Sequence, residues 1–445
     1  MEVTETAAAG LKHEFRVVVP AIDLEAKVNE RLDELKSRVQ LRGFRPGKVP
    51  IAHLKRLYGK SAMAEVIEAA VREANDKIVT DRGFRLAIAP KVVLPEDKAA
   101  IEGIIAGKSD LAYTVEVEIV PPITLADFKA IKLTRLVSDV TEAGIEQALQ
   151  SLAEKSRSFL AKSEGAEKGD RVTISYEGTV DGKPFAGGKA EDIPITLGSE
   201  GFIPGFADQL SGIKAGETRT FDVTFPQDYT AALAGKPARF TVTAKAVEAP
   251  GPVMIDDELA KAFGLESLTK LREAVRERIQ REHAAASRGK LKRALLDQLD
   301  TLHKFAPPPS LVEQEFASVW ASVEKELKAR GHTFADEDTT EEKARAEYRD
   351  IAERRVRLGL VIAEIGEKNN IKVTDEQLSA AVMEQARRLP GQERQVWDYY
   401  HHNPDALAAL RAPLFEDKVA DFLIELAEVT EKQVLRDELF KDNEA

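Results

Sequence analysis

Residues 172–188 read VTISYEGTVDGKPFAGG, and residues 195–217 read ITLGSEGFIPGFADQLSGIKAGE. Short apolar runs at 172–176, 221–225 and 240–244 are separated by Asp-Gly, Gly-Gly and Pro-Gly pairs. Residues 165–249 hold 12 of the 27 glycines, where an even spread would place about 5. Apolar runs of strand length divided by tight-turn residues predict a small antiparallel β domain.

The chain before this domain has a mixed pattern. Alternating apolar residues in 11–19 and 111–119 predict half-buried strands, and helical spacing in 24–39 and 63–78 predicts helices between them. Pro121-Pro122 ends the pattern, so we place an α/β domain at 1–120. A helical stretch in 141–160 then predicts a connector over 121–164.

Residues 250–445 are predicted to be all helix, with long helices. Three capping-box patterns indicate helix starts, at Ser310, Thr374 and Thr430. Pro307-Pro308-Pro309 predicts a stiff turn between two of the helices. The fold class is therefore multidomain α+β, with domains at 1–120, 121–164, 165–249 and 250–445.

Composition excludes several functions. The 445 residues include 64 Lys+Arg and 76 Asp+Glu, a net charge of −12 that disfavours DNA or another polyanion as the partner of the whole chain. The absence of cysteine excludes disulfides, thiolate zinc sites and cysteine nucleophiles. The amino terminus lacks the basic and apolar regions of a signal peptide, and no apolar stretch reaches membrane-span length. We expect a cytoplasmic protein without membrane contact.

The sequence contains few enzyme motifs. The seven histidines form no metal-ligand pattern, so no metal is expected. The stretch from Gly43 to Val49 is one residue short of a phosphate loop and has valine where Mg²⁺ needs a hydroxyl. No cofactor is expected.

One charge anomaly remains in residues 36–60. This stretch has eight basic residues and no acid: Lys36, Arg38, Arg42, Arg45, Lys48, Lys55, Arg56 and Lys60. At its centre, GFRPGKVP (43–50) has the glycines and prolines of an exposed turn that presents one aromatic ring among cations. This composition suits docking on a ribonucleoprotein. The pattern alone fits an ordinary loop with solubilising lysines equally well.

GFRPGKVP resembles the ribosome-binding signature of the trigger factor family of bacterial chaperones. The matching residues are Gly43, Phe44, Arg45, Gly47, Lys48 and Pro50. Many members have lysine where this chain has Pro46, so one cation is lost here. The order of domains is also similar over essentially the whole chain.

Residues 165–249 resemble the FKBP-type peptidyl-prolyl isomerases in the order and spacing of their motifs. The resemblance implies that the proline pocket is lined by Tyr176, Phe185, Phe202, Ile203, Phe206, Tyr229 and Phe240. Phe206 takes the place of the tryptophan floor of stand-alone members, and Ile193 a position often held by phenylalanine. Ala186 replaces a common acid, which removes a polar wall, so we expect reduced activity or altered drug binding.

A pocket without a nucleophile suits this reaction. Rotation about an X–Pro bond faces a barrier of ~18–20 kcal/mol because resonance gives the C–N bond double-bond character. An apolar aromatic cup can hold the proline ring, desolvate the amide and favour the twisted form. Each ~1.36 kcal/mol of preferential stabilisation gives a tenfold rate increase.

The resemblance implies an ATP-independent chaperone that docks on the large ribosomal subunit near the exit tunnel, on protein and rRNA. Its other partners would be nascent and unfolded polypeptides, and a second copy of the chain off the ribosome. One alternative is a prolyl isomerase acting mainly on released, partly folded proteins. Others are a periplasmic chaperone–isomerase, disfavoured by the missing signal peptide, and an RNA-binding protein that uses residues 36–60.

Overall fold

The computed structural model describes residues 1–38, 44, 49–95, 97–199, 202–226, 233–337 and 339–441. The chain forms two compact units. The first comprises Met1–Ile131, Leu295–Leu327 and Thr333–Ala427. The second comprises Lys132–Ala294, Lys328–His332 and Glu428–Ala445. Each unit contains hydrophobic cores of its own.

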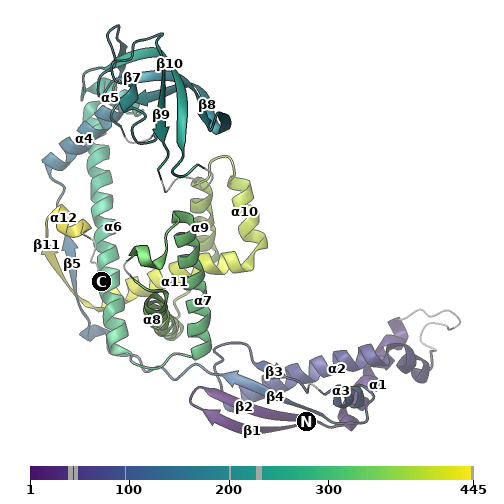
Figure 1. Ribbon diagram of the computed structural model, residues 1–445. Coiled ribbons are helices and arrows are strands. Elements are labelled where there is room, and N and C mark those ends of the chain that lie inside the picture. The colour runs from purple at the N-terminus through teal and green to yellow at the C-terminus, as the bar shows by residue number, and fades with distance from the viewer. Residues whose placement is uncertain are drawn as a thin grey trace. The chain divides into compact units, whose positions relative to one another are not determined.

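The amino-terminal part of the first unit is a four-stranded antiparallel sheet with helices packed on it (Figure 1). The strand order is β1-β2-β4-β3. The strands are β1 (Glu2–Ala9), β2 (Lys12–Val19), β3 (Lys91–Val93) and β4 (Leu111–Glu118). The helices are α1 (Ala21–Arg38), α2 (Ile51–Arg82), α3 (Lys98–Ile105) and the short η1 (Phe128–Ala130). The predicted α/β character is confirmed.

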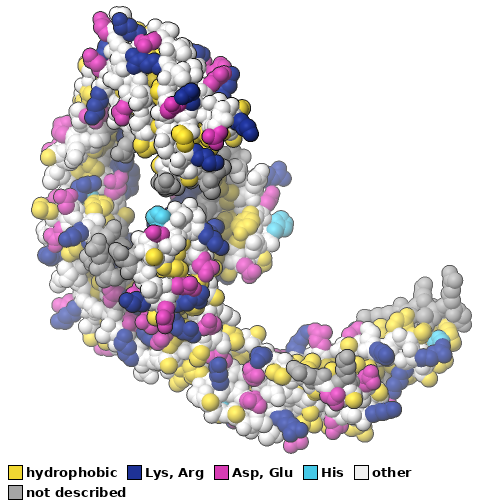
Figure 2. Space-filling model, in the orientation of Figure 1, with side chains coloured by type: hydrophobic (Ala, Val, Ile, Leu, Met, Phe, Trp, Pro, Cys, Tyr) yellow, Lys and Arg dark blue, Asp and Glu magenta, His cyan; other side chains and the backbone are white. Residues whose placement is uncertain are grey.

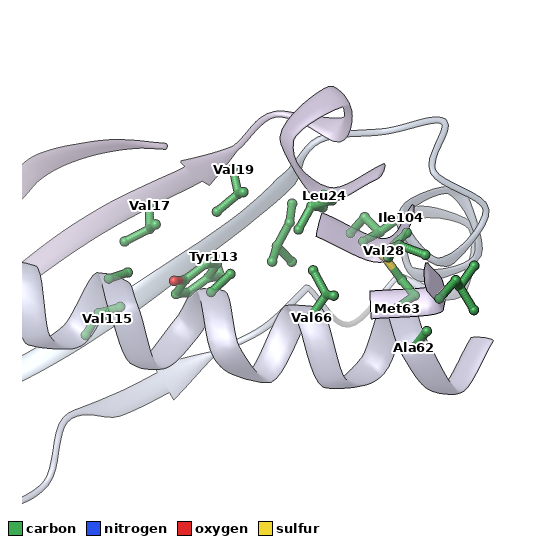
Figure 3. Packing of buried hydrophobic residues seen from close by; sticks show 14 of the residues in the cluster. Val17, Val19, Leu24, Val28, Ala62, Met63, Val66, Ile104, Tyr113 and Val115 are labelled. Atoms are coloured by element: carbon green, nitrogen blue, oxygen red, sulfur yellow. The ribbon is translucent and has the colours of Figure 1, made fainter. Parts of the chain in front are cut away.

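Alternation along the strands builds the core of this part. Phe15, Val17 and Val19 of β2 are at most 3% exposed, while the residues between them face outward or are half-buried. Figure 3 shows Val17 and Val19 facing the same interior as Val28 of α1 and Met63 of α2. Helix α2 ends at Arg82 because Gly83 takes a left-handed φ of 62°, which glycine adopts without strain.

The rest of the first unit is helical. Its helices are the last part of α6 (Leu268–Leu302), α7 (Pro309–Arg330), η3 (Phe334–Glu337), α8 (Glu341–Lys368), α9 (Asp375–Arg387), α10 (Glu393–His402) and α11 (Pro404–Leu426). The predicted proline turn separates α6 from α7. The capping box at Thr374 is confirmed, since Thr374 and Gln377 each accept the other's backbone N–H. The one at Ser310 is wrong, because Ser310 lies inside the first turn of α7.

The second unit contains a five-stranded antiparallel sheet, as predicted (Figure 1). Its strands are β6 (Phe159–Ala161), β7 (Arg171–Val180), β8 (Lys183–Thr196), β9 (Thr218–Thr224) and β10 (Pro237–Pro250). The order is β6-β10-β7-β8, with β9 also paired to β10, and the short helix η2 (Asp208–Leu210) precedes β9. Asp181 and Gly182 both have positive φ, which makes the tight β7–β8 turn.

The other elements of the second unit are mainly helical. They are β5 (Lys132–Val137), α4 (Glu142–Ser156), α5 (Asp257–Ala262), most of α6, β11 (Glu428–Gln433) and α12 (Arg436–Phe440). Strand β11 pairs in parallel with β5, so the helix start predicted at Thr430 is wrong. Thr430 opposes Thr134, and its hydroxyl donates to the Leu133 carbonyl. Tertiary pairing here overrides a local capping pattern.

Within the described residues, no helix is both long and apolar enough to cross a membrane. The same residues contain no group of three or more His, Asp or Glu side chains that could hold a metal ion.

Candidate functional site

Phe206 is the buried centre of an aromatic cluster on the five-stranded sheet. The residue is 1% exposed, and its ring centroid lies 5.1 Å from that of Phe240, 5.2 Å from Phe221 and 5.4 Å from Phe202. The Phe202 ring is stacked, whereas the Phe221 and Phe240 rings stand edge-on. These are the arrangements that aromatic quadrupoles favour. Phe206 and Phe240 together form a rigid apolar floor.

Half-buried side chains rise around this floor. Tyr176, Phe185, Phe202 and Ile203 pack on the buried cluster but keep part of their surface in solvent. The Tyr176 ring stands edge-on to Phe206 and Phe240, and its hydroxyl donates to the Gly187 carbonyl at 3.3 Å. A buried floor with half-exposed walls can accept an apolar ring from outside.

Gly178 of β7 makes room for two of these rings. A Cβ atom there would lie 2.5 Å from the Phe240 ring and 3.2 Å from the Phe185 ring. Phe240 lies opposite Gly178 in the β10–β7 register, so the strand pairing places the Phe240 ring over Gly178. Any side chain larger than that of glycine at residue 178 would collide with this ring.

The structure therefore brings together six of the seven predicted pocket residues. Phe185 joins the cluster through Phe240 and Phe225, at centroid distances of 6.2 and 5.6 Å. Tyr229 lies outside the described residues. Ile193 packs on the same cluster, and Ala186 is exposed.

Sequence reasoning missed Phe221 and Phe225. Phe221, Val223 and Phe225 alternate along and just after β9, within the short apolar run from which the strand was predicted. The alternation places them on one face. The β9–β10 register, in which Phe221 opposes Phe240, brings that face to the cluster.

The charged groups near the cluster face outward and are paired. A hydrogen bond from Lys189 holds the pKa of Glu177 below its ordinary value, and Arg239 does the same for the pKa of Asp222. Both carboxylates are therefore ionised at neutral pH. The phenylalanine and isoleucine side chains of the cup have no titratable group, so the cup can bind and desolvate a substrate without proton transfer.

The second candidate site is the segment around Phe44. Phe44 is 38% exposed, and its ring lies 5.2 Å from the ring of His53 in α2. Val49 is buried in the core, and the Pro50 carbonyl accepts the N–H groups of His53 and Leu54 in the first turn of α2. Phe44 is thus presented beside a helix start that is anchored in the core. Gly43, Arg45, Gly47 and Lys48 lie outside the described residues.

Two of the basic side chains in residues 36–60 form ion pairs with acids, which the charge count of this stretch does not show. Lys55 contacts Glu25 at 2.6 Å and lowers the pKa of that carboxyl, and Lys36 contacts Asp33 at 3.3 Å. Both acids lie outside residues 36–60, in α1. On the face drawn in Figure 2, acidic and basic side chains are interspersed among the described residues. The described part of this segment is therefore not a purely basic surface.

A third set of residues is exposed on the helical part of the first unit. It consists of the apolar side chains Met383, Leu389, Trp397 and Tyr399, between 44% and 56% exposed. Helix α10, which carries Trp397 and Tyr399, has no buried residue. Large exposed apolar side chains grouped in this way are suited to binding other apolar surfaces.

Residues 162–245, which carry the antiparallel sheet and its aromatic cup, match the family described as FKBP-type peptidyl-prolyl cis-trans isomerase. The fold, the cup and this match together define a multidomain FKBP-type peptidyl-prolyl isomerase. Residues 1–152 match the bacterial trigger factor protein family, and residues 267–425 match the trigger factor C-terminus.

Curated relatives named trigger factor match this chain over its full length. The chain is 59% identical to the trigger factor of Afipia carboxidovorans and 57% identical to that of Rhodopseudomonas palustris strain CGA009. Each alignment covers 100% of this chain and 99% of the relative. A solved structure from work on promiscuous substrate recognition by the trigger factor chaperone shares the fold, with a TM-score of 0.56 at 21% identity. The structural alignment covers 96% of this chain and 99% of the chain in that structure. The chain belongs to the trigger factor family of ribosome-associated chaperones with peptidyl-prolyl isomerase activity.

Proposed function

We propose that the chain docks on the large ribosomal subunit near the exit tunnel, contacting protein and rRNA, and holds nascent chains without ATP. In this proposal residues 1–120 dock, residues 165–249 isomerise X–Pro bonds, and residues 121–164 and 250–445 hold clients. The protein acts in the cytoplasm and pairs with a second copy when it is off the ribosome.

The observation that carries the docking proposal is the exposure of Phe44. An aromatic ring that is 38% exposed, beside a helix anchored in the core, offers apolar surface that a partner can bury. Burying a phenylalanine contributes about 1.5–3 kcal/mol. Arg45, carried over from the family signature, adds a charge-assisted contact to phosphate or carboxylate.

Co-sedimentation with ribosomes tests this proposal. Phe44→Ala should weaken binding by about one to two decades at physiological salt, since ~1.4 kcal/mol corresponds to one decade. Leu57→Ala is the matched control, because Leu57 is on α2 and is 51% exposed but lies outside the signature. Wild-type binding by Phe44→Ala would exclude the ring as anchor.

For the isomerase, we propose that Tyr176, Phe185, Phe202, Ile203, Phe206, Tyr229 and Phe240 form the proline site. The buried floor and half-exposed rim among the described members support this assignment. Because the described members of the cup are phenylalanine, isoleucine and tyrosine, residue types that do not ordinarily change charge between pH 6 and 8, the isomerisation rate should be nearly flat over that range. A rate that followed a titration curve in a peptide assay would show that an acid or base takes part.

A further inference from the structure

A groove in the second unit lies apart from the aromatic cup and from Phe44. Its volume is about 970 Å³, within the range of ligand sites. It is bounded by α4, by α6 and by the segment from Gln433 to Glu438. Ser138 and Asp139 directly follow β5 and Val434 directly follows β11, so the groove lies at the carboxyl ends of the two parallel strands.

The groove has an apolar lining with one unusual member. Its apolar residues are Ala148, Leu152, Val275, Ile279, Val434 and Leu435. Val275 is 5% exposed and belongs to the core, whereas Leu435 is 80% exposed. A leucine left in water at the edge of an apolar groove gains stabilisation from any apolar group that covers it.

His283 of α6 supplies a buried acceptor in the groove wall. The residue is 6% exposed, and its Nδ1 lies 2.9 Å from the Ser138 carbonyl oxygen. A carbonyl can only accept, so in the neutral imidazole Nδ1 carries the proton and Nε2 is left with a lone pair. Nε2 is buried without a hydrogen-bond partner. The site therefore calls for an N–H or O–H donor.

The charged residues of the groove are of both signs. Arg278 pairs with Glu282 at 2.8 Å, and Lys155 and Arg436 are accompanied by Asp139 and Asp437. The remaining acid, Glu438, pairs with Lys432 at 3.3 Å. A strongly charged ligand would gain little from this mixture. The ring of Phe440 in α12 stands edge-on to the His283 ring at 5.6 Å, so this five-residue helix packs against the histidine. Because Nε2 is buried, a donor can reach it only through a local displacement of the groove wall.

We propose that this groove binds an extended segment of a non-native polypeptide. One apolar side chain of the segment covers Leu435 and the apolar floor, and a backbone N–H donates to His283 Nε2. A polypeptide fits because each of its apolar side chains is accompanied by a backbone N–H. The proposal rests on the client-holding function proposed above and assigns it a specific surface in the second unit.

The test uses the full chain and a short capped fluorescein peptide of alternating leucine and serine, which has no proline for the isomerase site. Leu435→Asp should weaken peptide binding, measured by anisotropy, about ten-fold or more. Leu160→Asp is the matched control, because Leu160 is in the same unit, 59% exposed and outside the groove. Equal affinities of wild type and Leu435→Asp would overturn the proposal.

The hydrogen bond has its own test. N-methylation of the peptide at one position should weaken binding to wild type about three- to ten-fold, and this penalty should disappear in His283→Phe. If no methylated peptide binds more weakly to wild type, the His283 contact is excluded, whether or not His283→Phe folds. Aggregation of an unfolded client is measured in parallel. If the wild type suppresses this aggregation and Leu435→Asp binds the peptide as tightly as the wild type, the proposal that clients bind in the groove is wrong. The client-holding function proposed above would still hold.

Discussion

Two neighbouring rings in the aromatic cup have different surroundings, and their roles can be separated. Phe206 is buried among four other rings, whereas Phe202 is stacked on it and half-exposed. A buried ring contributes mainly to stability, and a half-exposed ring is available to substrate. The pair therefore distinguishes the floor of the cup from its wall.

Phe202→Ala should lower the rate of X–Pro isomerisation with little loss of stability, because it removes an exposed wall. Phe206→Ala should lower the rate as well, and should also cost about 3–5 kcal/mol of domain stability. A protease-coupled peptide assay measures the first effect and thermal unfolding the second. A folded Phe202→Ala protein with the wild-type rate would remove Phe202 from the site.

Asp170 is a buried carboxylate beside the same sheet. Burial by itself would raise its pKa, but hydrogen bonds from Lys162 Nζ and the Glu167 N–H, both at 2.8 Å, outweigh burial and lower the pKa below 3.8. A lowered folded-state pKa stabilises the fold above the unfolded value, and this contribution is lost as the pH falls through the folded pKa.

Lys162→Met should therefore lower the free energy of unfolding at pH 7, where Asp170 is ionised in the wild type. The deficit should shrink as the pH falls through the lowered folded-state pKa of Asp170, below which the carboxyl is protonated in both proteins. Urea unfolding of wild type and Lys162→Met, at pH 7 and in acid, measures the difference in free energy of unfolding at each pH. An equal deficit in both would indicate that Lys162 acts through packing alone.

At the scale of elements, α10 is a helix that packs against its neighbours without burying any of its residues. It carries Trp397, which is 44% exposed, while the other tryptophan, Trp320, is 6% exposed. Trp320 lies against the rings of Phe316 and Phe334, with Arg345 4.4 Å from its centroid. The fluorescence of Trp397 therefore reports on the surface of α10, and that of Trp320 reports on the core.

If α10 binds clients, adding an unfolded polypeptide should shift tryptophan emission to the blue as Trp397 leaves water. Trp397→Phe should abolish the shift, because the remaining Trp320 is already buried. A shift that persists in Trp397→Phe would place client binding elsewhere. Fluorescence titration with a reduced, unfolded protein that lacks tryptophan provides the measurement.

At the scale of the whole molecule, the first unit joins an amino-terminal sheet to helices far along the chain. The Glu118 carboxylate at the end of β4 is 5% exposed and accepts the Ser310 N–H at 3.2 Å and the Ser310 hydroxyl. Arg85 bonds Glu364 of α8 and lowers the pKa of that carboxyl, with Lys368 assisting and burial opposing. A carboxylate at the start of α7 also complements the helix dipole.

Ser310→Ala should cost about 1–3 kcal/mol, because the buried Glu118 carboxylate loses a donor. Ser322→Ala is the control, since Ser322 is on the same helix, is exposed and bonds only the Ser318 carbonyl in its own helix. Urea unfolding followed by circular dichroism measures both variants. Equal stabilities would show that Glu118 is satisfied without the hydroxyl.

The sequence by itself determined most of the helices and strands. It also determined their order along the chain (an α/β part, an antiparallel β domain, then helices) and the family resemblance. Alternation in β2 and β4, helical spacing in α2 and the turn residues around 181–188 act over a few residues, so they can be read locally. Most of the aromatic cup was also predictable, because its side chains lie in short motifs. The docking role of residues 43–50 stays a prediction.

Tertiary structure alone decided the contacts that join distant segments. Thr430 is in a strand because it meets Leu133, 297 residues away, and Ser310 meets Glu118 across 192 residues. Phe221 joins the cup through the β9–β10 register, and His283 Nε2 is buried without a hydrogen-bond partner in a wall that packs against α12. Local patterns record only the conformational preferences of neighbouring residues. The partner of a buried polar group or a strand edge depends on the path of the whole chain, and the burial it achieves there outweighs the local preference.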